Sequence, residues 1–149
     1  MKQKFNSYDL RQRLEDYLVY GSYPEIVVTG GRREKIELLE ELVGSYLMKD
    51  VLALERIRSS RTLVDLLKLI AFQVGSEVSL SELAIQVKLD VKTVGRYLDL
   101  LEKAFVIVRV GGFSRNLLNE VTSKAKYYFL DNGVRNAVIG QYNLLRFSQ

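Results

Sequence analysis

Hydrophobic residues recur at helical spacing over most of this chain, and the clearest run lies in its second half. After Asp90, apolar side chains follow at intervals of three and four residues: Val91, Val94, Leu98, Leu101 and Phe105. Because an α-helix has about 3.6 residues per turn, these side chains share one face. The Asp90 carboxylate can accept the free N–H groups of a first turn. The pattern predicts an amphipathic helix that begins after Asp90, with polar residues opposite: Lys92, Arg96, Asp99 and Lys103.

Two further helices are predicted upstream of this one. Ser79 and Glu82 have the spacing of a capping box, and a short apolar stripe follows Ser79. Residues 63–74 are almost wholly apolar and are followed by Gly75, which readily ends a helix. Two short helices that cross and bury their stripes against a third form a helix-turn-helix. The core expected for this unit comprises Leu67, Ile70, Leu83, Leu98 and Leu101.

Two strand-like runs follow the helix-turn-helix. Residues 105–110 and 126–130 are rich in β-branched or aromatic residues and are bounded by turn formers. We expect these runs to pair as a wing. The predicted fold class is therefore mainly α, of the α+β type, in which a winged helix-turn-helix carries a short two- or three-stranded wing.

The first third of the chain predicts helices with one aromatic turn. Residues 5–19 form an amphipathic pattern through Leu10, Leu14, Tyr17 and Leu18, and residues 20–25 interrupt it. Residues 34–57 predict a long helix that bends near Gly44, and a polar break follows at residues 58–61. We expect a helical segment over residues 1–58, a winged helix over 59–131, and a short helix with a tail over 132–149. Asp131 is expected to cap that short helix.

Composition removes several classes of chemistry. The 149 residues contain no histidine and no cysteine, so a histidine base, a thiol nucleophile and the usual zinc ligands are all excluded. Thr29-Gly-Gly-Arg-Arg33 lacks the lysine and serine or threonine of a phosphate-binding loop, so we interpret it as a basic turn. We expect no catalytic residues, no metal site and no cofactor in this chain. The polar start and the lack of a long apolar run predict a cytoplasmic protein with no membrane contact.

The charge distribution suggests a nucleic-acid interface. The net charge is +4, and residues 105–126 are the most basic stretch. The first turns of a recognition helix enter the major groove of DNA, and positive side chains release counterions from phosphates. The candidate duplex DNA-binding residues are Lys92, Thr93, Arg96, Arg109, Arg115, Lys124 and Lys126.

A protein partner is the alternative, and the aromatic turn is its candidate surface. Tyr20, Tyr23 and Glu25 lie close together around Pro24. This turn is either a docking surface or a packed corner, and the sequence leaves both open.

Several blocks of residues, in order, resemble a known family. They are residues 21–25 (Gly-Ser-Tyr-Pro-Glu), residues 46–51 (Tyr-Leu-Met-Lys-Asp-Val), residues 93–102, Asn116 and residues 126–133 (Lys-Tyr-Tyr-Phe-Leu-Asp-Asn-Gly). Together they resemble prokaryotic AAA-type ATPases that carry a C-terminal domain of unknown function. Lys49 departs from the family, in which an arginine is expected before Asp50.

The resemblance implies a longer parent protein. It implies an ATPase core before this region, a helical lid-like segment over residues 1–58, a winged helix over 59–131, and a restriction-endonuclease-like domain after a truncated tail at 132–149. Neither the ATPase core nor the nuclease-like domain lies in this chain. ATP and Mg²⁺ would then bind only in the missing ATPase domain, and this fragment would not be an enzyme. Two hypotheses follow for the fragment: a winged helix that binds DNA, or a module for protein interaction and interdomain coupling.

Overall fold

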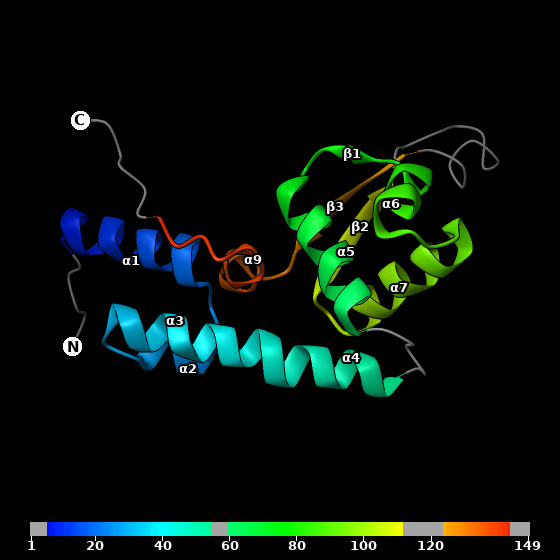
Figure 1. Cartoon of the computed structure of the whole chain (residues 1–149). Coiled ribbons are helices and arrows are strands. Elements are labelled where there is room, and N and C mark those ends of the chain that lie inside the picture. Colours follow the sequence, from blue (N-terminus) through cyan, green and yellow to red (C-terminus); the bar gives the residue numbers. More distant parts are fainter. Residues whose placement is uncertain (1–5, 55–59, 112–123, 144–149) are drawn as a thin grey trace.

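The computed structural model describes residues 6–54, 60–111 and 124–143. It is mainly helical with one small three-stranded antiparallel sheet, which is the α+β class that the pattern predicts. Figure 1 shows two lobes, a group of N-terminal helices and a winged helix, with α9 between them.

The N-terminal lobe begins with α1 (Ser7–Tyr20), α2 (Pro24–Val28) and α3 (Arg32–Glu41). The side chain of Asn6 caps α1, and Gly21 ends it with a φ of +78°. Pro24 occupies the first turn of α2, where its fixed φ suits a helix and its missing N–H costs nothing. The pattern around Pro24 predicts only a turn, so α2 is a difference between the expected and the observed fold.

Beyond α3 the chain stays helical and runs beneath both lobes (Figure 1). A π-helical segment, η1 (Leu42–Leu47), leads into α4 (Met48–Leu54). The structure has a π-helical segment where the sequence predicts a bend near Gly44, and the bend itself stays a prediction. A Cβ at Gly44 would meet nothing within 4 Å, so close packing does not explain this glycine.

The winged helix consists of α5 (Ser60–Phe72), β1 (Glu77–Val78), α6 (Leu80–Val87), α7 (Val91–Lys103), β2 (Ile107–Gly111) and β3 (Ala125–Phe129). Both predicted caps are confirmed. The Ser79 hydroxyl accepts the Glu82 N–H at 3.4 Å, and the Asp90 carboxylate accepts the Thr93 N–H at 2.8 Å. The Thr93 hydroxyl also donates to Asp90, and these bonds lower the pKa of the Asp90 carboxyl.

The sheet has the strand order β1-β3-β2, and every pairing is antiparallel. Ile107 pairs with Phe129 and Val78 pairs with Ala125. The wing strands β2 and β3 were predicted, whereas β1 was not, because two residues carry no readable alternation.

The predicted core is confirmed. Leu67, Ile70, Leu83, Leu98 and Leu101 are all buried in one cluster. Two residues of the predicted α7 stripe are not buried with the others. Val91 is exposed in the first turn of α7, and Phe105 is exposed beyond the end of the helix, with a φ of +56°. The helical periodicity therefore holds only between Asp90 and Ala104, the caps of α7.

Helix α9 (Asn132–Ile139) follows β3 directly and returns to the N-terminal lobe, where it packs against α1 and α3 as well as α5. Val134 and Val138 belong to the winged-helix core. Ala137 packs on a second cluster that contains Tyr20 and Tyr142. The short helix expected to lead away from the winged helix is thus shared by both lobes.

Candidate functional site

The turn after α1 lies against the start of α9, and one carboxylate joins them. The Ser22 N–H donates to Asp131 Oδ2 at 2.7 Å and the Ser22 hydroxyl donates to the same oxygen at 3.1 Å. Asp131 Oδ1 accepts the Val134 N–H at 3.0 Å, so the predicted helix cap is confirmed. A single buried side chain therefore holds together two segments that are 109 residues apart.

Two glycines permit this close approach. A Cβ on Gly21 would overlap the Asp131 carboxylate, and Gly21 has a φ of +78°, which favours glycine. A Cβ on Gly133 would overlap the carbonyl of Tyr20. We call Gly21, Ser22, Asp131 and Gly133 the junction.

Polar side chains of α9 extend the junction to other helix ends. The Asn136 amide donates to the carbonyls of Leu18 and Val19, at 3.3 and 2.8 Å. Arg135 Nε donates to the carbonyl of Ala71 at 3.1 Å. Helix ends leave carbonyls without partners inside the helix, so these bonds fix the C-terminal ends of α1 and α5 on α9.

A cavity of about 310 Å³ opens beside the junction. Its lining joins both lobes: Ser22, Tyr23, Pro24, Phe105, Val106, Leu130, Asp131 and Val134. Phe105 and Leu130 are 77% and 54% exposed. Burial, followed by the charge of Asp131, raises the pKa of Tyr23.

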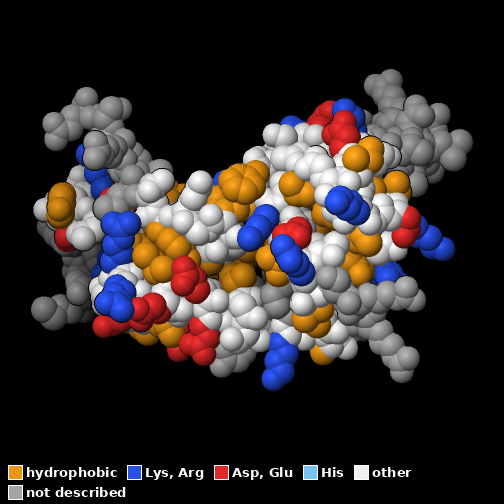
Figure 2. Space-filling model, viewed as in Figure 1, with side chains coloured by type: hydrophobic (Ala, Val, Ile, Leu, Met, Phe, Trp, Pro, Cys, Tyr) orange, Lys and Arg blue, Asp and Glu red, His pale blue; other side chains and the backbone are white. Residues whose placement is uncertain are grey.

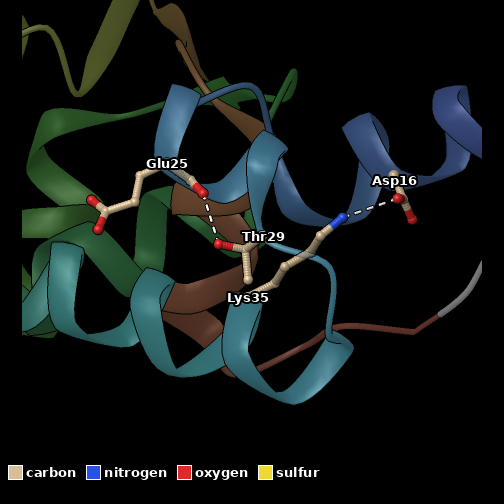
Figure 3. A network of polar contacts seen from close by, with 4 residues as sticks. All are labelled: Asp16, Glu25, Thr29 and Lys35. Carbon is tan, nitrogen blue, oxygen red and sulfur yellow. Dashed lines mark hydrogen bonds and ion pairs between the residues drawn. The ribbon is translucent and has the colours of Figure 1, made fainter.

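The structure separates the three residues of the predicted interaction turn. Tyr20 is 3% exposed and lies in the N-terminal core. For this residue the structure therefore corrects the docking hypothesis, because the side chain packs inside the protein. Its burial raises its pKa, which the charge of Arg32 opposes. Tyr23 is half-buried and Glu25 is exposed. Figure 3 shows the Glu25 carboxylate pointing away from Thr29, whose hydroxyl donates to the Glu25 carbonyl at 2.8 Å.

An ion pair with a buried lysine joins α3 to α1, and no pattern in the sequence signals it. Lys35 Nζ is 3.0 Å from Asp16 Oδ2, and the Lys35 side chain is 10% exposed (Figure 3). The ammonium also lies 5.2 Å from the centre of the Tyr20 ring. These groups line a second cavity of about 350 Å³, together with Arg13, Tyr17, Val27 and Val28.

The candidate nucleic-acid residues on α7 are accessible. Lys92 and Arg96 are exposed, while the Thr93 hydroxyl is engaged by Asp90 at 2.7 Å. Asp99 lies on the same helix and is exposed as well. The polar face of α7 therefore presents both signs of charge.

The wing residues do not extend that basic face. Arg109 pairs with Tyr127 on the side of the sheet that faces the helices, where the charges of Asp99 and Glu102 act on the same tyrosine. Lys126 pairs with Val110 and with Glu77, on the opposite face of the sheet.

Two candidates remain, Lys124 and Arg115. Lys124 is exposed directly before β3. Arg115 lies outside the described residues. The predicted basic residues that the structure describes are thus divided among the polar face of α7 and the two faces of the sheet.

The described part of the chain holds no group of three or more histidine, cysteine, aspartate or glutamate side chains that could hold a metal ion. None of its helices is long and apolar enough to cross a membrane.

Residues 11–144 match a domain of unknown function, DUF8612. The chain belongs to this family. This DUF8612 chain is 27% identical over 143 residues to an uncharacterised protein of Haemophilus influenzae, a match that covers 89% of the chain and 36% of the relative. It is 23% identical over 128 residues to an uncharacterised protein of Methanocaldococcus jannaschii, covering 83% of the chain and 29% of the relative. The chain thus spans about a third of the length of these relatives. No solved structure matches it.

Proposed function

We propose that this DUF8612 chain is a non-catalytic coupling module of a longer, cytoplasmic AAA-type ATPase. One observation carries the proposal. Two blocks on which the resemblance to these ATPases rests, residues 21–25 and 126–133, meet at the junction, where Ser22 donates twice to Asp131. Residues that hold two lobes together are suited to passing a movement from one lobe to the other.

The packing of α9 gives the coupling a physical basis. Helix α1 cannot shift relative to α9 without breaking the bonds that Asp131 and Asn136 make. Helix α9 in turn cannot shift without displacing Val134 and Val138 from the winged-helix core. A push on α1 would therefore reach the winged helix, because close-packed interiors transmit strain.

The longer relatives provide a direct test. About two thirds of the Haemophilus influenzae relative lies outside the matched segment, which leaves room for an ATPase core. We expect the full-length relative to hydrolyse Mg-ATP. Removing the matched segment should leave nucleotide binding intact and change kcat. A full-length relative that does not bind ATP would refute the proposal.

The chain itself should show no saturable binding of Mg-ATP by calorimetry, since it lacks a phosphate-binding loop. Saturable micromolar binding would place a nucleotide site within this chain, and the proposal places it in the ATPase core outside the chain.

Duplex DNA is the second candidate ligand, and the accessible front of α7 favours it. Lys92 and Arg96 are exposed on neighbouring turns. Gly95 lies between them, and a Cβ there would meet nothing within 4 Å, so the backbone is open to close approach.

The salt dependence of DNA affinity tests this second candidate. Replacing Lys92 and Arg96 together by alanine should reduce the slope of log affinity against log salt by about one unit for each phosphate that these side chains neutralise. The matched control replaces Arg11 and Arg33, which removes the same charge from the N-terminal lobe. Fluorescence anisotropy on a mixed-sequence duplex measures both. Equal slopes in the two variants, or no binding at low salt, would exclude α7 as a DNA reader.

A further inference from the structure

Two charged residues are buried in the described part of the chain, and they differ in their partners. Lys35 and Asp131 are 8% and 9% exposed. Lys35 forms an ion pair with Asp16. Asp131 accepts three hydrogen bonds, all of them from neutral groups of Ser22 and Val134. The N-terminus of α9 offsets about half a unit of its charge. Because buried charges in proteins are normally paired, the rest of this negative charge calls for a cation.

Asp131 lines the cavity of about 310 Å³ beside the junction, and its charge acts on the cavity wall. The rest of the described lining is apolar or aromatic apart from Ser22. Burial, and then the charge of Asp131, raise the pKa of Tyr23 in this wall. Hard metal ions prefer several oxygen ligands, whereas organic cations are attracted to aromatic rings. The lining therefore suits an organic cation.

The charged residues around the cavity leave the charge of Asp131 in place. Glu25 on α2 and Lys103 at the end of α7 are exposed and carry opposite charges. The Glu102 carboxylate accepts a backbone N–H of β2 at 3.0 Å, and Arg135 donates to a carbonyl near the end of α5. Figure 2 shows one face of the molecule, on which lysine and arginine side chains lie among aspartate and glutamate side chains on both lobes. Selection of a ligand by charge at this cavity therefore depends on Asp131.

Phe105, which also lines the cavity, occupies a position at which glycine is usual. It follows the C-cap of α7 with a φ of +56°. The N–H groups of Phe105 and Val106 donate to carbonyls of the last turn of α7, at 3.0 and 2.9 Å, as in a Schellman motif. Val106 and Leu101, which hold the positions of the apolar contact in this motif, are buried. The Phe105 ring is 77% exposed and plays no part in this cap, so the strained position points to a role in binding.

We propose that this cavity binds an arginine side chain of a partner polypeptide, with the guanidinium beside Asp131. Apolar neighbours of that arginine cover Phe105 and Leu130. Arginine fits better than lysine, because its guanidinium is more weakly hydrated and stacks on aromatic rings such as that of Tyr23. An arginine surrounded by an apolar rim is a frequent anchor of protein interfaces. The proposal holds whether or not the junction couples an ATPase.

A small-molecule cation fits the site less well. The cavity lies at the lower end of the range of small-molecule sites, about 300–1,000 Å³. Phe105 and Leu130 are 77% and 54% exposed, and a ligand confined to the cavity would leave most of this apolar surface in water. A polypeptide can place one side chain in the cavity and cover both residues with its neighbours.

Two synthetic peptides test the role of charge. In both, one residue stands between leucines: arginine in the first peptide, and its uncharged isostere citrulline in the second. Fluorescence anisotropy with the full chain should show saturable binding of the arginine peptide and at least about tenfold weaker binding of the citrulline peptide, since interactions with charged groups are the stronger ones. Asp131→Asn should remove this preference, and asparagine still caps a helix.

Phe105→Gly tests the cavity wall without a cost in folding. Glycine favours this φ, so the melting temperature should stay the same or rise. Affinity for the arginine peptide should fall about tenfold or more, because large aromatic contacts dominate such interfaces. Lys88→Gly is the matched control, since Lys88 also has a φ of +56° but ends α6 and does not line the cavity. It should not weaken binding, and circular dichroism checks that every variant is folded.

Four results would overturn the proposal. The first is equal affinity for the arginine and citrulline peptides. The second is binding of the arginine peptide that survives Phe105→Gly. The third is binding of argininamide as tight as that of the peptide, which would assign the cavity to a small-molecule cation. The fourth is a dimer in light scattering that Phe105→Gly abolishes, which would assign the surface to a second copy of the chain.

Discussion

At the scale of single residues, Gly21 and Gly133 have no side chain, and this lets the turn after α1 lie against the start of α9. Gly133→Ala would drive a methyl group into the carbonyl of Tyr20. We expect a loss of about 1–3 kcal/mol in the free energy of unfolding, as for other overpacked sites. Urea denaturation measures it.

Gly95 provides the matched control for this substitution. It lies within α7, and a Cβ there would meet nothing within 4 Å. Gly95→Ala should therefore stabilise the protein by up to about 1 kcal/mol. If both alanines shift the urea midpoint in the same direction, the steric account of the junction fails.

Tyr142 gives a prediction in alkaline solution. Its hydroxyl is buried without a hydrogen-bond partner among the described residues. Burial, and then the charge of Glu40, raises its pKa to about 12. Because the folded protein holds this proton more tightly than the unfolded chain, with its ordinary pKa of about 10, stability should fall as pH rises from 10 to 12.

The variant Tyr142→Phe isolates this effect from those of other tyrosines. It should lose nothing at neutral pH, since no hydrogen bond to the described residues is removed, and it should show a shallower loss of stability above pH 10. Thermal melts of both proteins across pH 8–12 measure the difference. Parallel curves would mean that Tyr142 ionises as readily in the folded state as in the unfolded chain.

Local bonds of single residues were predictable, and distant ones were not. Ser79, Asp90 and Asp131 cap helices because their side chains reach an N–H three residues ahead, which spacing alone reveals. The second role of Asp131, as acceptor for Ser22, depends on where two remote segments meet. The burial of Lys35 depends on Asp16 in the same way.

At the scale of elements, α7 carries the core of the winged helix. Leu98 is 3% exposed and lies in the cluster with Leu67 and Ile70. Leu98→Ala should lower the free energy of unfolding by about 2–5 kcal/mol, because apolar burial is reduced and a cavity remains. The control Ile85→Ala, at an exposed site, should stay within about 0.5 kcal/mol of the parent. An unchanged melting temperature for Leu98→Ala would contradict this packing.

The sequence predicted the winged helix well because its elements follow one another and pack with their neighbours. It predicted α1 as an amphipathic helix but not which way the helix faces. Periodicity identifies the apolar side of a helix and says nothing about what covers it. In α1 the side that periodicity marks, through Leu10 and Leu14, is the exposed one.

At the scale of the whole molecule, α9 supports the N-terminal lobe from the far end of the sequence. It packs against α1, α3 and α5. A chain that ends at Leu130 should therefore lose hydrogen-exchange protection in α1 and α3 by a larger factor than in β2 and β3, whose partners remain. Exchange measured by mass spectrometry provides the comparison within one sample. Full protection of α1 and α3 in the shortened chain would show that the N-terminal lobe folds without α9.

The division of the chain expected from the sequence stays a prediction, and side-chain packing crosses both of its boundaries. The boundary near residue 58 reflects a polar stretch, but Val51 of α4 is fully buried in the winged-helix core. Residues 132–143 contribute Ala137 and Tyr142 to the cluster of the N-terminal lobe, and Val134 and Val138 to the winged-helix core. Which lobe a segment joins depends on its packing against segments far away in the sequence, and the composition of the segment does not indicate this packing.

The bond between Ser22 and Asp131 also has a consequence for the nascent chain. Ribosomes add about 5–20 residues per second, so the 109 residues between the two partners take on the order of ten seconds to synthesise. During that interval Val19, Ile26 and Leu39 have left the ribosome without the helix that completes their cluster. Strand β3, which completes the sheet of the winged helix, leaves the ribosome only shortly before α9. The N-terminal helices must wait for α9, and until it emerges their apolar side chains are exposed to aggregation.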